Sequence, residues 1–239
     1  MATPVKVKAL VSNVTKFSKD VVMYDFKPQG RVPLFKSGQF LHLSVEEYDG
    51  IGEWPESRVF SIASSPKNKD EKIKIIVSAK GKYTSKIVSV LKQNDIVWLK
   101  LPYGEFQIKD NDKPIVLVAG GTGISPFIPF MEQRLLQPAS NKVVLYYGIK
   151  NEDLIICNEL LDKCSSAENN FSTHLYLENE PKNFREASTG ILDKEKIFQD
   201  NKFHADYYLS GPIEMINNFK DYFIAMGVSE NNIFIDNWN

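Results

Sequence analysis

Three glycines follow an apolar run in the second half of the chain, where residues 116–126 read Val-Leu-Val-Ala-Gly-Gly-Thr-Gly-Ile-Ser-Pro. Glycines let a backbone approach a pyrophosphate closely, and the N–H groups at a helix N-terminus attract negative charge. The stretch is not a full G-x-G-x-x-G motif, because Pro126 stands where the third glycine would be. Proline suits the first turn of a helix, so we expect a strand, a nucleotide-binding turn and a helix; a turn without a ligand is the alternative.

Two further motifs lie in the first half of the chain. Residues 58–65 read Arg-Val-Phe-Ser-Ile-Ala-Ser-Ser, and in a strand Arg58 and Phe60 share one face while Ser61 lies on the other. A half-buried edge strand without a ligand is the alternative. The second motif is Gly-Lys-Tyr-Thr over residues 81–84, where we expect Thr84 to be the N-cap of a helix. A helix N-terminus beside a lysine could receive a phosphate.

The elements that must position these motifs differ between the two halves. Short strands are expected at residues 5–14, 21–26, 39–45, 58–63, 72–78 and 95–101, with one helix at 84–91. This pattern predicts a small antiparallel β-barrel. Beyond residue 112, strands at 115–119, 142–148, 171–177, 205–210 and 233–236 alternate with helices near 125–136, 153–164 and 213–226. Alternation of this kind predicts a doubly wound, parallel, five-stranded sheet. We therefore expect two domains, 1–112 and 113–239.

Composition limits the classes of protein that fit. The chain has 239 residues, of which 43% are hydrophobic and 25% charged, as in globular proteins. No apolar run approaches the about 20 residues of a membrane helix. The N-terminus lacks the apolar region of a signal peptide. A soluble, cytoplasmic protein is expected.

Metal and disulfide chemistry are not expected. Cys157 and Cys164 fall on one predicted helix, about 10 Å apart at its rise per residue, which is too far for a disulfide. Two cysteines are also too few for a cysteine-ligated iron–sulfur cluster. The histidines His42, His174 and His204 show no metal-ligand spacing.

Charge is divided unevenly along the chain. Residues 1–112 carry 18 Lys and Arg against 13 Asp and Glu, whereas residues 113–239 carry 11 against 17. The first half therefore has a net charge of +5 and the second a net charge of −6. Neither half is basic enough to indicate nucleic-acid binding. A basic face that steers an acidic partner is one interpretation, and ordinary solvated lysines are the other.

Taken together, the motifs resemble those of the ferredoxin–NADP⁺ reductase superfamily. The matching segments are 58–61, 81–84, 101–106 (Leu-Pro-Tyr-Gly-Glu-Phe), 120–126 and 210–212 (Ser-Gly-Pro), in the family's order across the whole chain. The resemblance implies a flavin domain followed by a pyridine-nucleotide domain, and hydride transfer from the nicotinamide to flavin N5. FAD is the expected cofactor, with FMN as the alternative, and NADH or NADPH is the hydride donor.

The resemblance also assigns roles to residues. Arg58 matches the arginine that holds the flavin phosphate, Phe60 the aromatic on the ring, and Ser61 the hydroxyl at N5. Ser61 and Ser210 are the catalytic candidates. The residues implied at the flavin are Arg58, Val59, Phe60, Ser61, Ile76, Ser78, Gly81, Tyr83, Thr84 and Trp238. Those implied at the pyridine nucleotide are Gly120, Gly121, Thr122, Gly123, Pro126, Lys150, Glu178, Ser210, Gly211 and Pro212.

Five positions carry the open questions. Ser210 stands where most members have a cysteine, and Phe60 stands where most have a tyrosine. Trp238 resembles the C-terminal aromatic that covers the flavin in some members, or it packs on the final strand. For the coenzyme, Lys150 favours a 2′-phosphate, whereas Glu178 repels one and can accept bonds from ribose hydroxyls.

The leading hypothesis is a flavin-dependent NAD(P)H reductase that passes electrons to a small, acidic redox protein, such as a ferredoxin, a flavodoxin or an oxygenase component. A reductase of free flavin is the first alternative. An electron-transfer subunit that does not turn over by itself is the second. Neither nucleic acid nor a membrane is an expected partner.

Overall fold

The structure is a computed structural model that describes residues 3–66, 72–109, 111–166, 170–180 and 187–237. The chain divides into two compact units. The first comprises residues 1–107 with 128–130, and the second comprises residues 108–127 with 131–239. We call them the first and the second domain.

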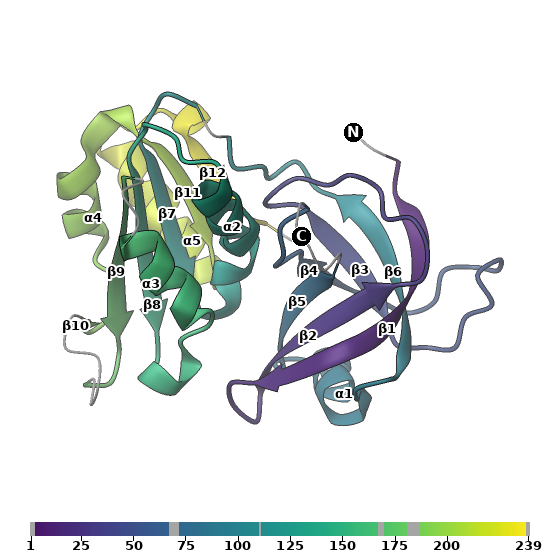
Figure 1. The fold of residues 1–239 in the computed structure, drawn as a ribbon. Helices are drawn as coiled ribbons and strands as arrows, with labels where there is room; N and C mark the ends of the chain where they lie inside the picture. The colour runs from purple at the N-terminus through teal and green to yellow at the C-terminus, as the bar shows by residue number, and fades with distance from the viewer. Residues whose placement is uncertain (1–2, 67–71, 110, 167–169, 181–186, 238–239) are drawn as a thin grey trace. The chain divides into compact units, whose positions relative to one another are not determined.

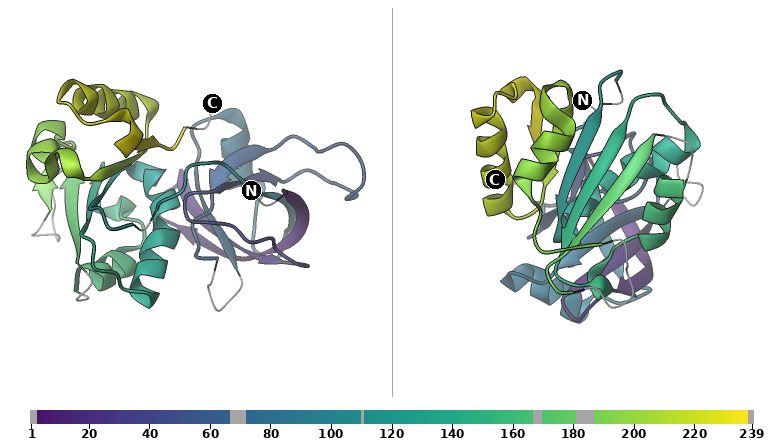
Figure 2. Two further views of the ribbon diagram at one scale, coloured as in Figure 1. Left: turned by 90° about the horizontal axis from the view of Figure 1, so that it is seen from above. Right: turned by 90° about the vertical axis from the view of Figure 1, so that its left-hand side faces the viewer.

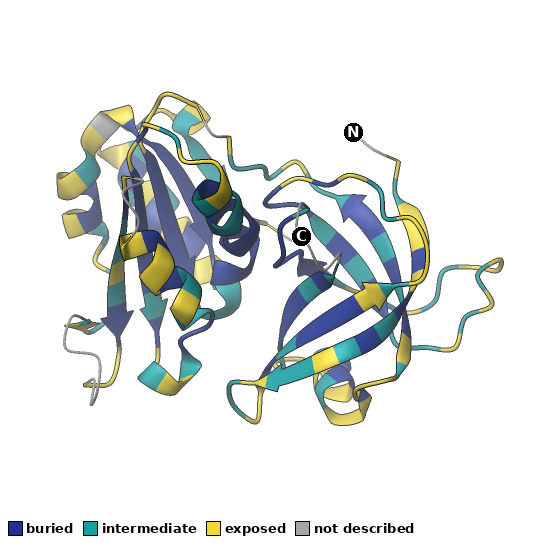
Figure 3. Cartoon of the chain, viewed as in Figure 1, coloured by how far each residue is buried: buried dark blue, intermediate teal, exposed yellow. Residues whose placement is uncertain are grey.

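The first domain is a six-stranded antiparallel sheet curled into a near-barrel, as the sequence predicts (Figure 1). Its order is β4-β3-β6-β1-β2-β5. The strands are β1 (Val5–Lys16), β2 (Val21–Pro28), β3 (Phe40–Ser44), β4 (Arg58–Ser61), β5 (Ile73–Ser78) and β6 (Ile96–Tyr103). Buried and accessible residues alternate along the strands (Figure 3): Val7, Ala9 and Val11 of β1 all point into the core. Helix α1 (Lys82–Val90) lies at one end of the barrel and buries Tyr83 and Ile87.

A long connection between β3 and β4, residues 45–57, reaches out beyond the strands (Figures 1 and 2). We call it the acidic loop, because it contains five Asp and Glu and no Lys or Arg. The loop is packed by aromatic rings: Tyr48 makes edge contacts with Trp54 and Trp98, at centroid distances of 5.6 and 5.1 Å. It therefore has a defined conformation although it is long.

The second domain contains the predicted doubly wound parallel sheet, in the order β10-β9-β8-β7-β11-β12. Its strands are β7 (Ile115–Gly120), β8 (Val143–Ile149), β9 (Phe171–Leu177), β10 (Ser188–Thr189), β11 (Asp206–Ser210) and β12 (Ile233–Ile235). The five expected strands are all present, and the two-residue β10 adds a sixth. All residues of the central strands β7 and β11 are buried, because helices cover both faces of the sheet.

The helices lie in two layers: α4 and α5 cover one face of the sheet, and α2 and α3 the other (Figure 2). They are α2 (Ile128–Leu136), α3 (Asn158–Ser166), α4 (Lys194–Asn201) and α5 (Ile213–Ala225). Short 3₁₀ segments span Gly121–Phe127, Glu152–Leu154, Lys202–His204 and Glu230–Asn232. Helix α4 was not predicted, because its buried stripe is only Ile197 and Phe198. Its readable signal is Asp193, whose side chain accepts bonds from the backbone N–H groups of Glu195 and Lys196.

The predicted helix near residues 153–164 is wrong at its start. Cys157 has a φ of +60°, which interrupts a helix, and α3 begins only at Asn158. Cys157 and Cys164 are therefore not on one helix, and neither is part of a disulfide. Among the described residues, no helix has the length and apolar character needed to cross a bilayer.

Candidate functional site

An aromatic ring joins two of the motifs in the first domain. Arg58 begins β4, and its guanidinium carbon Cζ lies 4.8 Å from the centroid of the Tyr83 ring. Tyr83 is buried in the first turn of α1, and its hydroxyl donates a 2.7 Å hydrogen bond to the backbone oxygen of Glu56. Because of this ring contact, the arginine is held beside the N-terminus of α1.

The predicted N-cap of this helix is wrong. Helix α1 begins at Lys82 and its N-cap is Gly81, so Thr84 lies within the first turn. The Thr84 hydroxyl turns back instead, accepting a bond from the Gly81 N–H at 2.9 Å and donating to the Gly81 carbonyl at 3.0 Å. A Cβ at Gly81 would meet only Thr84 Oγ1, at 3.8 Å. An anion could therefore approach the first-turn N–H groups, which have no acceptor within the helix.

A second cation, which the sequence analysis missed, lies on the same ring. The ammonium of Lys86 is 5.8 Å from the Tyr83 centroid, because residues three apart share a helix face. That i, i+3 spacing is the signal by which Lys86 could have been found. Its ammonium donates a 2.5 Å hydrogen bond to Glu46, which raises the pKa of Lys86. We call the α1 cluster the set Arg58, Gly81, Tyr83, Thr84 and Lys86.

The other residues implied at the flavin lie on β4 and β5, the two outer strands in the sheet order. These strands come side by side where the sheet curls. Just beyond β4, the N–H of Ala63 donates a 2.8 Å hydrogen bond to the backbone oxygen of Lys74 on β5. Phe60 and Ser61 are 9% and 8% exposed. Their neighbours in the set are Val59 on β4 and Ile76 and Ser78 on β5. Trp238 lies outside the described residues.

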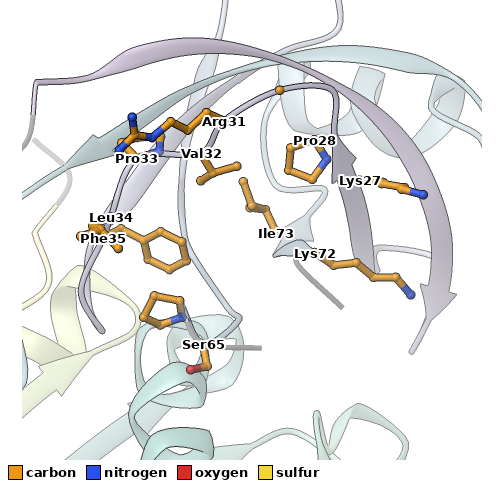
Figure 4. A pocket seen from close by; sticks show the side chains of 12 residues that line it. Lys27, Pro28, Arg31, Val32, Pro33, Leu34, Phe35, Ser65, Lys72 and Ile73 are labelled. Atoms are coloured by element: carbon orange, nitrogen blue, oxygen red, sulfur yellow. The ribbon is translucent and has the colours of Figure 1, made fainter. Parts of the chain in front are cut away.

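A cavity of about 340 Å³ opens in the same domain, between the segment after β2 and the start of β5 (Figure 4). Val32, Phe35 and Ile73 form an apolar part of its wall. The positively charged lining residues are Lys27, Arg31 and Lys72. Figure 4 shows the ends of Lys27 and Lys72 extending to the same side. The cavity combines apolar surface with positive charge.

In the second domain, the two glycine-containing motifs meet at the centre of the sheet. Strands β7 and β11 are neighbours in the sheet. From β7 the chain adds β8, β9 and β10 toward one edge of the sheet, and after β11 it adds β12 at the other edge. Ligands of such sheets bind at this switch point, beyond the carboxyl ends of the strands. A Cβ at Gly123 would lie 2.3 Å from the backbone oxygen of Ser210 and 2.6 Å from the nitrogen of Gly211. The missing side chain therefore lets the two turns touch.

The turn after β7 differs from the predicted helix start. Residues Gly121–Phe127 form a 3₁₀ helix that includes Pro126, and α2 begins at Ile128. The Ser125 hydroxyl donates a 2.7 Å hydrogen bond to the backbone oxygen of Thr122, which stabilises the tighter turn. Gly121 has a φ of +56° with no atom within 4 Å of an added Cβ. The backbone at Gly121 is consequently open to a ligand.

Ser210, the second catalytic candidate, is already hydrogen-bonded. Its hydroxyl donates a 3.0 Å hydrogen bond to the carboxylate of Asp236, and the two side chains are buried. The N–H of Asp236 in turn bonds the oxygen of Leu209 at 2.9 Å. Asp236 was missed in the sequence, because it approaches Ser210 only when β12 pairs with β11.

The two residues expected to select the coenzyme lie at adjacent strand ends. Lys150 follows β8 and Glu178 follows β9, and both are exposed. The N–H of Glu178 donates a 3.0 Å hydrogen bond to the backbone oxygen of Ile149. The N–H of Asn179 donates one of the same length to the backbone oxygen of Lys150. Both residues thus lie at the carboxyl edge of the sheet. Among the described residues, no cluster of His, Cys, Asp and Glu could hold a metal ion.

Two family models match the chain. Residues 6–125, about half of it, match a model described as "FAD-binding domain", and residues 117–221 match one described as "Oxidoreductase NAD-binding domain". The toluate 1,2-dioxygenase electron transfer component of Pseudomonas putida is 25% identical over 232 residues, 96% of this chain and 66% of the relative. The NAD(P)H-flavin reductase of Aliivibrio fischeri is 25% identical over 196 residues, 79% of this chain and 80% of the relative.

Solved structures share the fold. The cytochrome P450 reductase of Amycolatopsis has a TM-score of 0.82 at 20% identity, covering 98% of this chain and 69% of that one. A ferredoxin NADP⁺ reductase from Neisseria gonorrhoeae has a TM-score of 0.79 at 18% identity, covering 98% of each chain. The chain spans about two thirds or less of the length of several curated relatives, including the Pseudomonas putida protein.

The contact at Gly123 gives a testable expectation. Gly123→Ala places a methyl group against backbone atoms that cannot rotate away, and overpacking of this kind destabilises by about 1–3 kcal/mol. The free energy of unfolding of the second domain should fall by that amount, and NADH affinity should fall with it. Scanning calorimetry and NADH titration measure the two effects. Gly52→Ala is the control, because its Cβ would meet only the Asp49 side chain at 3.6 Å; equal effects of both substitutions would contradict the expectation.

Proposed function

Because the chain belongs to the ferredoxin–NADP⁺ reductase superfamily, with a FAD-binding domain followed by an NAD-binding domain, we propose that it oxidises NADH or NADPH and passes the electrons through FAD to a separate redox protein. The observation that carries the proposal is the α1 cluster, which lies within the residues of the matched FAD-binding model.

The α1 cluster fits the diphosphate of FAD. Arg58 supplies a planar guanidinium, whose geometry suits phosphate oxygens, and Lys86 adds a second positive charge on the same ring. The first turn of α1, kept open at Gly81, would add backbone N–H groups. Phosphate charge would therefore meet cations and helix N–H groups together.

Other residues of the first domain would orient the ring system. The buried Phe60 would pack on the isoalloxazine, and the Ser61 hydroxyl would donate a hydrogen bond to flavin N5. Bound FAD supplies the two-electron chemistry, accepting a hydride and releasing the electrons. The protein's contribution is to hold the reacting groups in alignment.

Residues of the second domain would hold the nicotinamide coenzyme. The pyrophosphate would lie against the open backbone at Gly121, near the end of β7. Ser210 would lie near the nicotinamide, with its hydroxyl oriented by Asp236. Lys150 and Glu178 would approach the adenosine ribose from adjacent strand ends.

Loss of Arg58 should release the flavin. Arg58→Ala removes a charge-assisted hydrogen-bond donor worth about 1.5–3 kcal/mol, so the Kd for FAD should rise at least about tenfold. Fluorescence titration of the flavin-depleted protein measures the Kd, and circular dichroism checks the fold. Arg58→Lys keeps the charge but loses the bidentate geometry of the guanidinium. Its Kd for FAD should therefore lie between those of the wild type and of Arg58→Ala. Unchanged FAD affinity in Arg58→Ala would disprove the assignment of Arg58.

Glu178 should disfavour NADPH. The carboxylate repels the 2′-phosphate and can bond the ribose hydroxyls of NADH, so the wild-type protein should use NADPH no better than NADH. Glu178→Arg should raise kcat/KM for NADPH about tenfold, since it replaces repulsion with a charge-assisted bond. Glu159→Arg, the same change on the exposed face of α3, is the control. A wild-type preference for NADPH of about tenfold or more would contradict this proposal.

We assign the acceptor to the class of small acidic redox proteins. Two observations favour this class: residues 1–112 have a net charge of +5, and the cavity of Figure 4 combines positive side chains with apolar wall. Acidic residues of the acceptor would pair with the cavity's cations, while an apolar side chain enters it. Exposed Leu34, which also lines the cavity, adds apolar surface for this contact.

Charge reversal at this cavity should weaken transfer to such an acceptor. In Lys27→Glu/Arg31→Glu, the KM for an acidic ferredoxin should rise about tenfold or more at low salt, because steering charges act mainly on association. Reduction of a neutral benzoquinone should not change. Lys16→Glu/Lys19→Glu, two exposed cations at the end of β1 and just beyond it, is the control with the same change of net charge. If the double variant and the control gave equal KM values for ferredoxin, the assignment of the cavity would be wrong.

A further inference from the structure

The acidic loop contacts the α1 cluster with two of its carboxylates. Glu56 lies 3.2 Å from the Arg58 guanidinium, and Glu46 lies 2.5 Å from the Lys86 ammonium. Both cations that would receive the FAD diphosphate are thus paired with the chain's own carboxylates. These pairs lie at the surface, with side-chain exposures of 35–58%.

The fold holds both carboxylates at this position. The Tyr83 hydroxyl donates to the backbone oxygen of Glu56 at 2.7 Å and accepts from the N–H of Val45 at 3.4 Å. One side chain of the cluster is therefore bonded to both ends of the acidic loop. Each end carries one of the two carboxylates that pair with Arg58 and Lys86.

The middle of the loop is also ordered. The Asp49 carboxylate accepts hydrogen bonds from the N–H groups of Gly52 and Ile51 at 2.9 and 2.8 Å, which lower the pKa of Asp49. The Tyr48 hydroxyl bonds the oxygen of Gly52 at 2.9 Å and lies against Lys6. With Tyr48 packed on Trp98, the loop cannot move away from the α1 cluster without losing these contacts.

We propose that Glu46 and Glu56 are internal counter-ions that compete with the FAD diphosphate for Lys86 and Arg58, and so weaken flavin binding. This inference rests on the proposed function, because it takes the α1 cluster as the diphosphate site. When FAD binds, each carboxylate must give up its cation or share it with a phosphate oxygen. The nearby negative charge then repels the ligand. These two carboxylates therefore favour a flavin that dissociates and rebinds over a permanently bound flavin.

The test compares carboxylate-to-amide variants of the full-length, flavin-depleted protein. Glu46→Gln and Glu56→Gln should each lower the Kd for FAD about two- to fivefold, the range expected from one exposed ion pair. The double variant should lower it further. Riboflavin, which has no phosphate, should bind equally to all variants. Glu53→Gln, an exposed change in the same loop, should leave FAD affinity unchanged.

The outcomes separate this inference from the proposed function. If wild-type protein binds FAD and Arg58→Ala weakens it, but the Gln variants bind FAD like wild type, the inference fails and the proposed function stands. The inference also fails if the Glu46→Gln and Glu56→Gln variants bind riboflavin as much more tightly as they bind FAD, because the effect would then not act through the diphosphate. It fails as well if Glu53→Gln lowers the Kd for FAD by the same factor. If wild-type protein binds no FAD, both fail.

Discussion

The nucleotide-binding domain depends on the close approach of two backbone turns, which the missing side chain at Gly123 permits. Strands β7 and β11 pair in register, with Ala119 opposite Ser210, so the turns that leave them must pass each other at the same edge of the sheet. A methyl group at residue 123 would occupy the space of the Ser210 carbonyl. The glycine at residue 123 is thus required for packing, whereas Gly121 leaves open space beside the backbone.

Tyr83 has a comparable role in the flavin-binding domain. Its ring contacts Arg58 and Lys86, and its hydroxyl bonds both ends of the acidic loop. One aromatic side chain therefore contacts both cations and is bonded to both ends of the loop that carries Glu46 and Glu56. If the α1 cluster binds the FAD diphosphate as we propose, the groups that attract and repel a phosphate are all positioned by Tyr83.

The sequence predicts the architecture well and the local chemistry less well. Strands such as β5 and β9 were predicted to within about one residue, because apolar runs bounded by turn residues carry a strong local signal. Helix α4 was missed, since its exposed surface leaves almost no apolar periodicity. The partners of the site residues, such as Asp236 for Ser210 and Glu46 for Lys86, depend on strand pairing and on a long loop. A local motif cannot contain that information.

The two cysteines lie in different surroundings, so a thiol reagent should distinguish between them. Cys164 lies in α3 with no exposed surface, and burial raises its pKa to about 12. Cys157, ahead of the helix, is half-buried. Because the thiolate is the reactive form, a maleimide would modify Cys157 in the native protein and reach Cys164 only after α3 detaches from the sheet. A dye on Cys157 would therefore be a single-site reporter, and a second modification would mark unfolding of that domain.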